Sequence, residues 1–349
     1  MNLSDSKKKL ALAGVVCGLV AACLAFLGNP ANMAFCIACF IRDTAGALGM
    51  HQAEAVQYAR PEIIGLVLGA FLISVATKEY RSTAGSSPMT RFVLGMIIMI
   101  GALVFLGCPL RMVIRMSAGD LNAWVALIGF VLGVATGVFA LKKGFSLGRA
   151  YVTNKESGAV ISVIVVGILI LALCTTLLKS STAGPGSVHA PIIAALIGGL
   201  VFGAFAQKSR MCFAGSIRDI ILMKNFDLFS VIAGLFVVML IFNVATGRFV
   251  LGFDTPGVIA HSEHIWNILG MYAVGFLPQT IGLATYGVAI GMYANSLWPA
   301  INAKWFGIAA LSVFFVINLC GVNVMAKAQK IMVVLLFLAL GMFIVLGVL

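Results

Sequence analysis

Two short stretches of the chain, "MAFCIACFIRD" (33–43) and "SRMCFAGSIRD" (209–219), share the pattern C-x4-I-R-D. The matched pairs are Cys36 with Cys212, Arg42 with Arg218, and Asp43 with Asp219, at an offset of 176 residues. A second pair, "VLGMIIMIG" (93–101) and "ILGMYAVGF" (268–276), repeats Leu-Gly-Met at an offset of 175. Two matches at nearly one spacing indicate an internal duplication.

The composition places both copies in a membrane. Of 349 residues, 62% are hydrophobic and 10% are charged, and the mean hydropathy is +1.11. A soluble domain could not bury that much apolar sequence. The net charge of +12 comes from basic residues that lie between apolar runs, as positive-inside topology requires. Nucleic acid is therefore excluded as the partner, and the lipid bilayer is expected.

Ten apolar runs are long enough to cross a bilayer, which needs about 17 residues or more. They lie near 10–28, 60–77, 90–107, 122–141, 158–178, 190–206, 228–246, 265–292, 303–322 and 329–349. The fold class predicted is all-α, a polytopic membrane protein.

Two further apolar segments, 30–41 and 209–222, are too short to cross. Asn29 followed by Pro30 is typical of a helix start, with Asn as N-cap and Pro as the first helical residue. Both segments are predicted to be half-helices that dip into the membrane, which is tolerated where they are buried in protein or line a cavity.

Five predicted spans lie between the two copies, so the copies would run through the membrane in opposite directions. This is the inverted-repeat arrangement of transporters. The expected units are a first repeat (1–180), an incomplete second repeat (181–276) and an atypical C-terminal segment (277–349), with "STAGPGSVHAP" (181–191) as the hinge. The distribution of Lys and Arg favours a cytoplasmic N-terminus.

The arginines of the repeat need a reason to lie at membrane depth, since each costs about 2.5 to 3.5 kcal/mol at a helix centre on insertion scales. Arg42 and Arg218 could simply pair with Asp43 and Asp219. Alternatively they are symmetric cations beside the path of an anion. The two interpretations are compatible if each Asp orients its Arg.

Cys36 and Cys39 have the spacing of a zinc clip or of a redox pair. A structural zinc site needs four ligands, and the repeat offers only Cys212, with Gly215 opposite Cys39. No metal and no cofactor are therefore predicted. A redox pair remains an alternative, because a nearby Arg lowers the pKa of a thiol, although no βαβ pattern surrounds it.

A third element, "GCPLR" (107–111), interrupts an apolar run. Pro109 cannot continue a helix but suits the first turn of the next one. Cys108 would then lie at a broken-helix joint close to Arg111, where a positive helix end can face an anion; simple packing of a buried Cys is the alternative. Because thiols are weak donors and acceptors, this pattern favours an anion that itself carries sulfur or selenium.

These residues resemble the YeeE/YedE family of sulfur-transport membrane proteins, and within it the YedE-like branch associated with selenium metabolism. The resemblance spans residues 10–276. The motifs that carry it are "CIACFIRD" (36–43), "ARPEIIGLVLGAFL" (59–72), "IGALVFLGCPLRM" (100–112), "GFSLGRAY" (144–151), "GPGSVHAP" (184–191) and "IAHSEHIWNILGM" (259–271).

The resemblance implies import of thiosulfate or a related small sulfur or selenium compound across a bacterial inner membrane, without catalysis. Cys36, Cys108 and Cys212 would guide the substrate, Cys39 would assist, and Arg and helix ends would offset its charge. A small sulfur-carrier protein at the cytoplasmic face is an expected partner.

The second half departs from the family pattern. The repeat register places the missing second joint at Leu283, where the motif is absent. The tail "NLCGVNVMAKAQKIMVVLLFLALGMF" (318–343) resembles part of an amino-acid permease. Besides a transporter, the sequence therefore leaves open a membrane thiol-exchange protein that uses Cys36 and Cys39, and an inactive hybrid.

Overall fold

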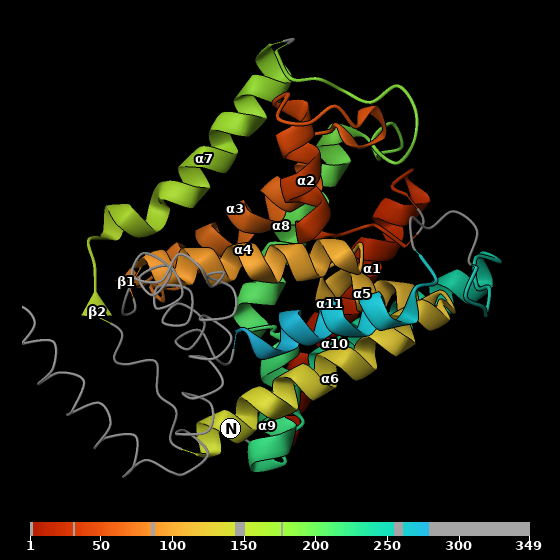
Figure 1. Cartoon of the computed structure of the whole chain (residues 1–349). Helices are drawn as coiled ribbons and strands as arrows, with labels where there is room; N and C mark the ends of the chain where they lie inside the picture. Colours follow the sequence, from red (N-terminus) through yellow and green to blue (C-terminus); the bar gives the residue numbers. More distant parts are fainter. Residues whose placement is uncertain are drawn as a thin grey trace, which may run out of the picture.

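A computed structural model describes residues 3–30, 32–84, 88–143, 151–175, 177–254 and 261–278 (Figure 1). The elements in chain order are α1 (Leu3–Phe26), α2 (Ile37–Ala47), the 3-10 helix η1 (Glu54–Val56), α3 (Pro61–Ala76), β1 (Thr83–Ala84), α4 (Pro88–Val104), α5 (Pro109–Ser117), α6 (Leu121–Lys142), β2 (Tyr151–Val152), α7 (Lys155–Cys174), α8 (Ile192–Ser209), α9 (Phe213–Met223), α10 (Asp227–Ala245) and α11 (His264–Phe276). Strands β1 and β2 form a two-residue antiparallel pair. The described architecture is otherwise helical, as the composition predicts.

Seven segments of the described residues are long and apolar enough to cross a membrane, and the chain is a multi-pass membrane protein. They are Lys7–Phe26, Glu54–Ala76, Phe92–Ser117, Leu121–Ala140, Lys155–Cys174, Ile192–Met223 and Asp227–Ala245. These correspond to the first seven predicted spans. Helix α11 begins the eighth, and the last two predicted spans lie outside the described residues.

Glycines set the helix packing. Gly65 and Gly69 of α3 lie against the backbone of α8, where an added Cβ would approach the carbonyl oxygens of Leu196 and Leu200. Gly14 of α1 meets α10 in the same way, and Gly129 and Gly133 of α6 meet α11. Small residues four apart let membrane helices approach closely. Helix α1 also packs against α8, so these two helices hold α3 and α10 together.

Both predicted short segments are helical, but their bounds differ from the prediction. Segment 30–41 is not a helix from Pro30; α2 begins at Ile37 with Cys36 as its N-cap. The proposed capping role of Asn29 is wrong because its side chain is engaged elsewhere: it accepts from Ala190 N–H (2.8 Å) and donates to the carbonyl of Ala34 (3.2 Å).

The second short segment, predicted at 209–222, is helix α9, which begins later, at Phe213, with Cys212 as its N-cap. Helix α8 ends just before it, where Arg210 adopts a left-handed conformation (φ 53°). In Figure 1, α2 lies toward the top of the helical bundle and α9 at the bottom.

The stretch 181–191 packs against the chain that leads into α3. The Ser181 N–H donates to the carbonyl of Gln57 (2.8 Å), the Ser181 hydroxyl accepts from the Gln57 N–H (2.8 Å), and the Gly186 N–H donates to Ala55 (2.9 Å). The ring of Tyr58 stacks on His189 with centroids 4.5 Å apart. The predicted hinge is therefore bonded to the first half of the chain.

Candidate functional site

The joint between α4 and α5 is a sharp break in an apolar span. Leu106 is left-handed (φ 60°), and the Gly107 N–H donates to the carbonyl of Ala102 (2.8 Å), which closes the last turn of α4. Pro109 is the first residue of α5, as predicted from its missing N–H. Cys108, between them, is buried and is the N-cap residue of α5.

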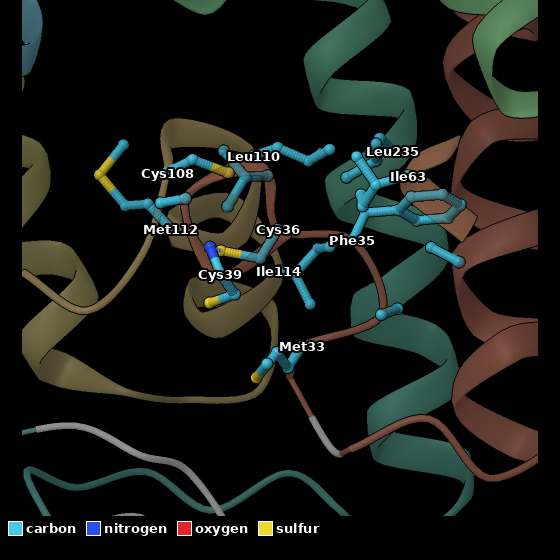
Figure 2. Close-up of a cluster of buried hydrophobic side chains, with 14 of the residues drawn as sticks. Met33, Phe35, Cys36, Cys39, Ile63, Cys108, Leu110, Met112, Ile114 and Leu235 are labelled. Atoms are coloured by element: carbon cyan, nitrogen blue, oxygen red, sulfur yellow. Dashed lines mark hydrogen bonds between the residues drawn. The ribbon is translucent and has the colours of Figure 1, made fainter. Parts of the chain in front are cut away.

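Three buried thiols meet at this joint (Figure 2). Cys36 is the N-cap residue of α2 and Cys108 that of α5, and the N–H of Cys39 donates to Cys36 Sγ (3.3 Å). The three thiols interact electrostatically with one another. The N-termini of two helices therefore lie at one group of sulfur atoms. Each such terminus carries a partial positive charge.

Arg111 adds a full positive charge beside the thiols. Its Nη1 donates to Cys39 Sγ (3.3 Å) and to the carbonyl of Leu106, and its Nε donates to Asn32 (3.4 Å). The side chain thus holds the left-handed turn and the loop before α2 at once. We call Cys36, Cys39, Cys108 and Arg111 the thiol–arginine cluster.

A buried ion network lies one turn along α2 from Cys39. Asp43 accepts from Arg42 Nε through Oδ1 (2.8 Å) and from Arg60 Nε through Oδ2 (2.7 Å). Arg60 Nη1 is 3.5 Å from Glu62 Oε1, and its Nη2 donates to the carbonyl of Pro185 (3.4 Å). Asp43, Arg60 and Glu62 are at most 1% exposed, so the network ties α2, α3 and the 181–191 stretch together in the interior.

The second copy of the motif has the same local form with less burial. The N–H of Gly215 donates to Cys212 Sγ (3.3 Å), as that of Cys39 does to Cys36 Sγ (3.3 Å). Arg218 Nη2 pairs with Asp219 Oδ1 at 2.9 Å, with the Arg side chain 41% exposed. Among the described residues no second arginine pairs with Asp219, unlike Asp43.

An apolar cavity of about 240 Å³ lies between α5, α6, α9 and α10. Met112 and Met116 of α5, Trp124 of α6, Phe213 of α9 and Phe236 of α10 contribute to its wall. The residue before Phe213 is Cys212, the N-cap of α9, and the residue before α5 is Cys108.

The structure brings together Cys36, Cys39, Cys108 and Arg111 of the predicted site, positioned by Pro109. Both predicted pairs, Arg42 with Asp43 and Arg218 with Asp219, are formed. Cys212 and Arg218 lie apart from the cluster, on α9. Sequence reasoning missed Arg60 and Glu62; the signal was an Arg-Pro-Glu sequence at the start of an apolar span, where charges need partners.

The thiols do not form a metal centre or a disulfide in the part of the chain that the structure describes. No group of three His, Cys, Asp or Glu side chains there has the arrangement to hold a metal ion, and all the cysteines described are free. The buried donors are instead backbone N–H groups, thiols and guanidinium groups, which suit an anion.

Comparison with known proteins finds a family match in the first part of the chain. Residues 2–136 match the family model described as sulphur transport. A search of curated proteins finds no match. The matched segment contains the whole thiol–arginine cluster and the Asp43 network, and it supports the resemblance to the YeeE/YedE family; it does not reach Cys212 or Arg218.

Proposed function

We propose that this protein is a membrane transporter of a small sulfur-containing anion, with thiosulfate as the first candidate, and that the thiol–arginine cluster is its substrate site. The observation that carries the proposal is the convergence of two helix N-termini, capped by Cys36 and Cys108, and of Arg111 on three buried thiols. This convergence lies inside the segment that matches the sulphur-transport family.

The chemistry of the cluster suits such an anion in two ways. Helix termini and a guanidinium stabilise negative charge, and the low dielectric of the interior strengthens that effect. The thiols can offer S–H donors to a soft terminal sulfur atom without binding it tightly. Weak, sequential contacts are what a permeation path needs, because the substrate must also leave.

We further propose that the chain contains an inverted repeat, with units at 1–180 and 181–276 followed by the segment 277–349. Matching Cys N-caps on α2 and α9 support it. The helix packing supports it too, because α3 packs on α8 and its counterpart α10 packs on α1. A two-fold axis through the α1–α8 contact would relate these two pairs. Helices α2 and α9 would be the dipping half-helices.

In this proposal the substrate passes between Cys212 and the thiol–arginine cluster through the space that the apolar cavity marks. Arg218 would attract the anion at the Cys212 end and Arg42 would act near Cys39. The N-terminus would be cytoplasmic in a bacterial inner membrane, and a small sulfur-carrier protein would receive the product on that side.

The test is counterflow in proteoliposomes loaded with thiosulfate, with thiosulfate, sulfite, selenite and sulfate offered outside in parallel. The proposal predicts exchange of thiosulfate and its loss in Cys36→Ala and Cys108→Ala. The matched control is Cys17→Ala, a buried cysteine of α1 whose thiol contacts the carbonyl of Phe202 (3.9 Å), away from the cluster. Exchange that survives both cluster substitutions would contradict the assignment of the site.

The second candidate, a membrane thiol-exchange protein, is favoured by the proximity of Cys36 and Cys39, since the Cys39 N–H donates to Cys36 Sγ (3.3 Å) and the two thiols interact electrostatically. It predicts a persulfide or mixed disulfide on Cys36 that mass spectrometry can trap after incubation with substrate. The third, an inactive hybrid, predicts no exchange by the natural chain and recovery when Gly-Cys-Pro-Leu-Arg is rebuilt at 282–286.

A further inference from the structure

The ion network behind the thiol–arginine cluster contains one carboxyl group that is poorly held. Glu62 is 1% exposed, and its Oε2 is buried without a hydrogen-bond partner in the described parts of the chain. Its Oε1 reaches Arg60 Nη1 only at 3.5 Å. Asp43, by contrast, binds two arginines at 2.7 Å each.

This difference assigns different charge states to the two carboxyls. A buried carboxylate is stable only when its oxygens are paired, and leaving one unpaired favours the neutral, protonated form. Arg60 Nε donates to Asp43 at 2.7 Å, whereas the Arg60 Nη1 that faces Glu62 lies 3.5 Å from Glu62 Oε1, at the long limit of a hydrogen bond. Glu62 is therefore the group of the network that can gain and lose a proton without breaking the Asp43 pairs.

The surroundings of Glu62 contain few competing charges. Arg60, Asp43 and the hydroxyl of Tyr58 interact with it electrostatically. Helix α8 presents Gly199 to the backbone of Glu62, and its ionisable residue, Lys208, lies in its last turn. On α7, Lys155 and Glu156 lie in the first turn. The carbonyl of Lys155 accepts from the hydroxyl of Tyr80, which follows the C-terminal end of α3, whereas Glu62 lies at its N-terminal end.

Two histidines lie near the network as well. His51 Nε2 is 3.0 Å from the carbonyl of Arg42, and His189 stacks on Tyr58. Among the described residues, no hydrogen bond, ion pair or ring contact joins either of them to the Glu62 carboxyl. An experiment must separate them from Glu62.

Protonation of Glu62 would change the charge that an anion meets at the cluster. The charged side chains around it are Arg42, Arg60, Arg111 and Arg115 against Asp43, Glu62 and Asp120. When Glu62 is neutral, one carboxylate fewer offsets the charge of these arginines. Arg60 also interacts electrostatically with Cys39, whose sulfur accepts from Arg111, so the added positive potential reaches the site.

We infer that Glu62 is a proton-binding site coupled to the anion site, and that the proton is the coupling ion of transport. The inference rests on the proposed function. One proton enters the Glu62 carboxyl as the anion binds and leaves it as the anion is released. By linkage, an anion that binds better to the protonated protein also raises proton binding by the same factor.

The test combines binding and flux on the purified full chain. In detergent, the affinity of the wild type for thiosulfate should rise as pH falls, by about fivefold or more, the usual range for coupled sites. Glu62→Gln mimics the protonated carboxyl, so its affinity should match the wild-type value at low pH and lose the pH dependence. The control Glu79→Gln removes an exposed carboxyl 3.6 Å from Lys208 and should behave as wild type.

In proteoliposomes with the membrane potential clamped, an inside-alkaline gradient should drive thiosulfate accumulation by the wild type. One pH unit can support at most about tenfold accumulation per coupled proton. Glu62→Gln should keep thiosulfate exchange and lose the response to the gradient.

Exchange without any pH dependence in the wild type would overturn proton coupling while leaving the transporter intact. A pH dependence that persists in Glu62→Gln would overturn the role of Glu62 and point to the histidines. Absence of thiosulfate binding and exchange in the wild type would instead overturn the proposed function, and proton coupling with it.

Discussion

The two copies of C-x4-I-R-D share a backbone and differ in surroundings. On α2 seven of eleven residues are buried, and on α9 two of eleven are. Asp43 holds Arg42 and Arg60, whereas Asp219 pairs with a half-exposed Arg218. The same motif therefore makes an internal charge network in one place and a peripheral ion pair in the other. Position in the fold, more than the motif, decides what each copy can do.

Substitution of Arg60, compared with substitution of Arg218, should show the largest difference in stability between the surroundings of the two copies. Arg60→Met removes one partner from a buried network and leaves Asp43 and Glu62 under-compensated, which costs about 3 to 5 kcal/mol of stability. Arg218→Met removes one member of a partly exposed pair and should cost at most about 1 kcal/mol. Thermal unfolding of both variants in one detergent measures the contrast. Equal losses would mean that burial does not distinguish the copies.

Asn29 should show a smaller effect of the same kind. Its side chain joins the loop before α2 to Ala190 in the other half of the chain. Asn29→Ala leaves buried backbone groups unpaired at a cost of about 1 to 3 kcal/mol. Asn225, which follows α9 and accepts from the Asp227 N–H at an exposed position, is the control. A loss for Asn225→Ala as large as for Asn29→Ala would contradict the tighter anchoring of the first copy.

The Cys N-caps should show the smallest effect and separate two roles of sulfur. Cys36→Ser and Cys212→Ser keep a capping acceptor, whereas the Ala variants remove it at about 0.5 to 2 kcal/mol each. If sulfur itself meets the substrate, Cys36→Ser should fold as wild type and still lose thiosulfate exchange. Full thiosulfate exchange by Cys36→Ser would mean that Cys36 serves only as the N-cap of α2.

Local patterns predicted much of this comparison. The Ile-Arg-Asp sequence predicted both ion pairs, and Pro109 predicted the start of α5, because these depend on neighbours in the chain. The helix start at Asn29 was wrong because a local bond to Ala34 and a tertiary bond to Ala190 replaced the expected cap. The cluster itself needs Cys39 and Arg111, 72 residues apart, to come together. No local pattern encodes that distance.

The absence of strong local signals also hid the ion network. Arg60 and Glu62 form no repeat with the second half of the chain, and the partner Asp43 lies 17 residues before Arg60. The rule that a charge within an apolar span needs a partner would have found Arg60 but not Asp43. The missing second joint and the C-terminal tail fall outside the described residues, so those predictions remain predictions.

The most direct measurement of the central claim compares thiosulfate exchange by Cys108→Ala and by Cys17→Ala in identically prepared proteoliposomes. The protein content is matched, and both variants are first found to unfold near the wild-type temperature. Each substitution removes one buried thiol, but Cys108 is the N-cap residue of α5 and interacts with Cys36, whereas Cys17 contacts the carbonyl of Phe202. The account predicts that Cys17→Ala exchanges as wild type and Cys108→Ala loses most of its exchange. Equal exchange by the two variants would contradict the assignment of the substrate site to the thiol–arginine cluster.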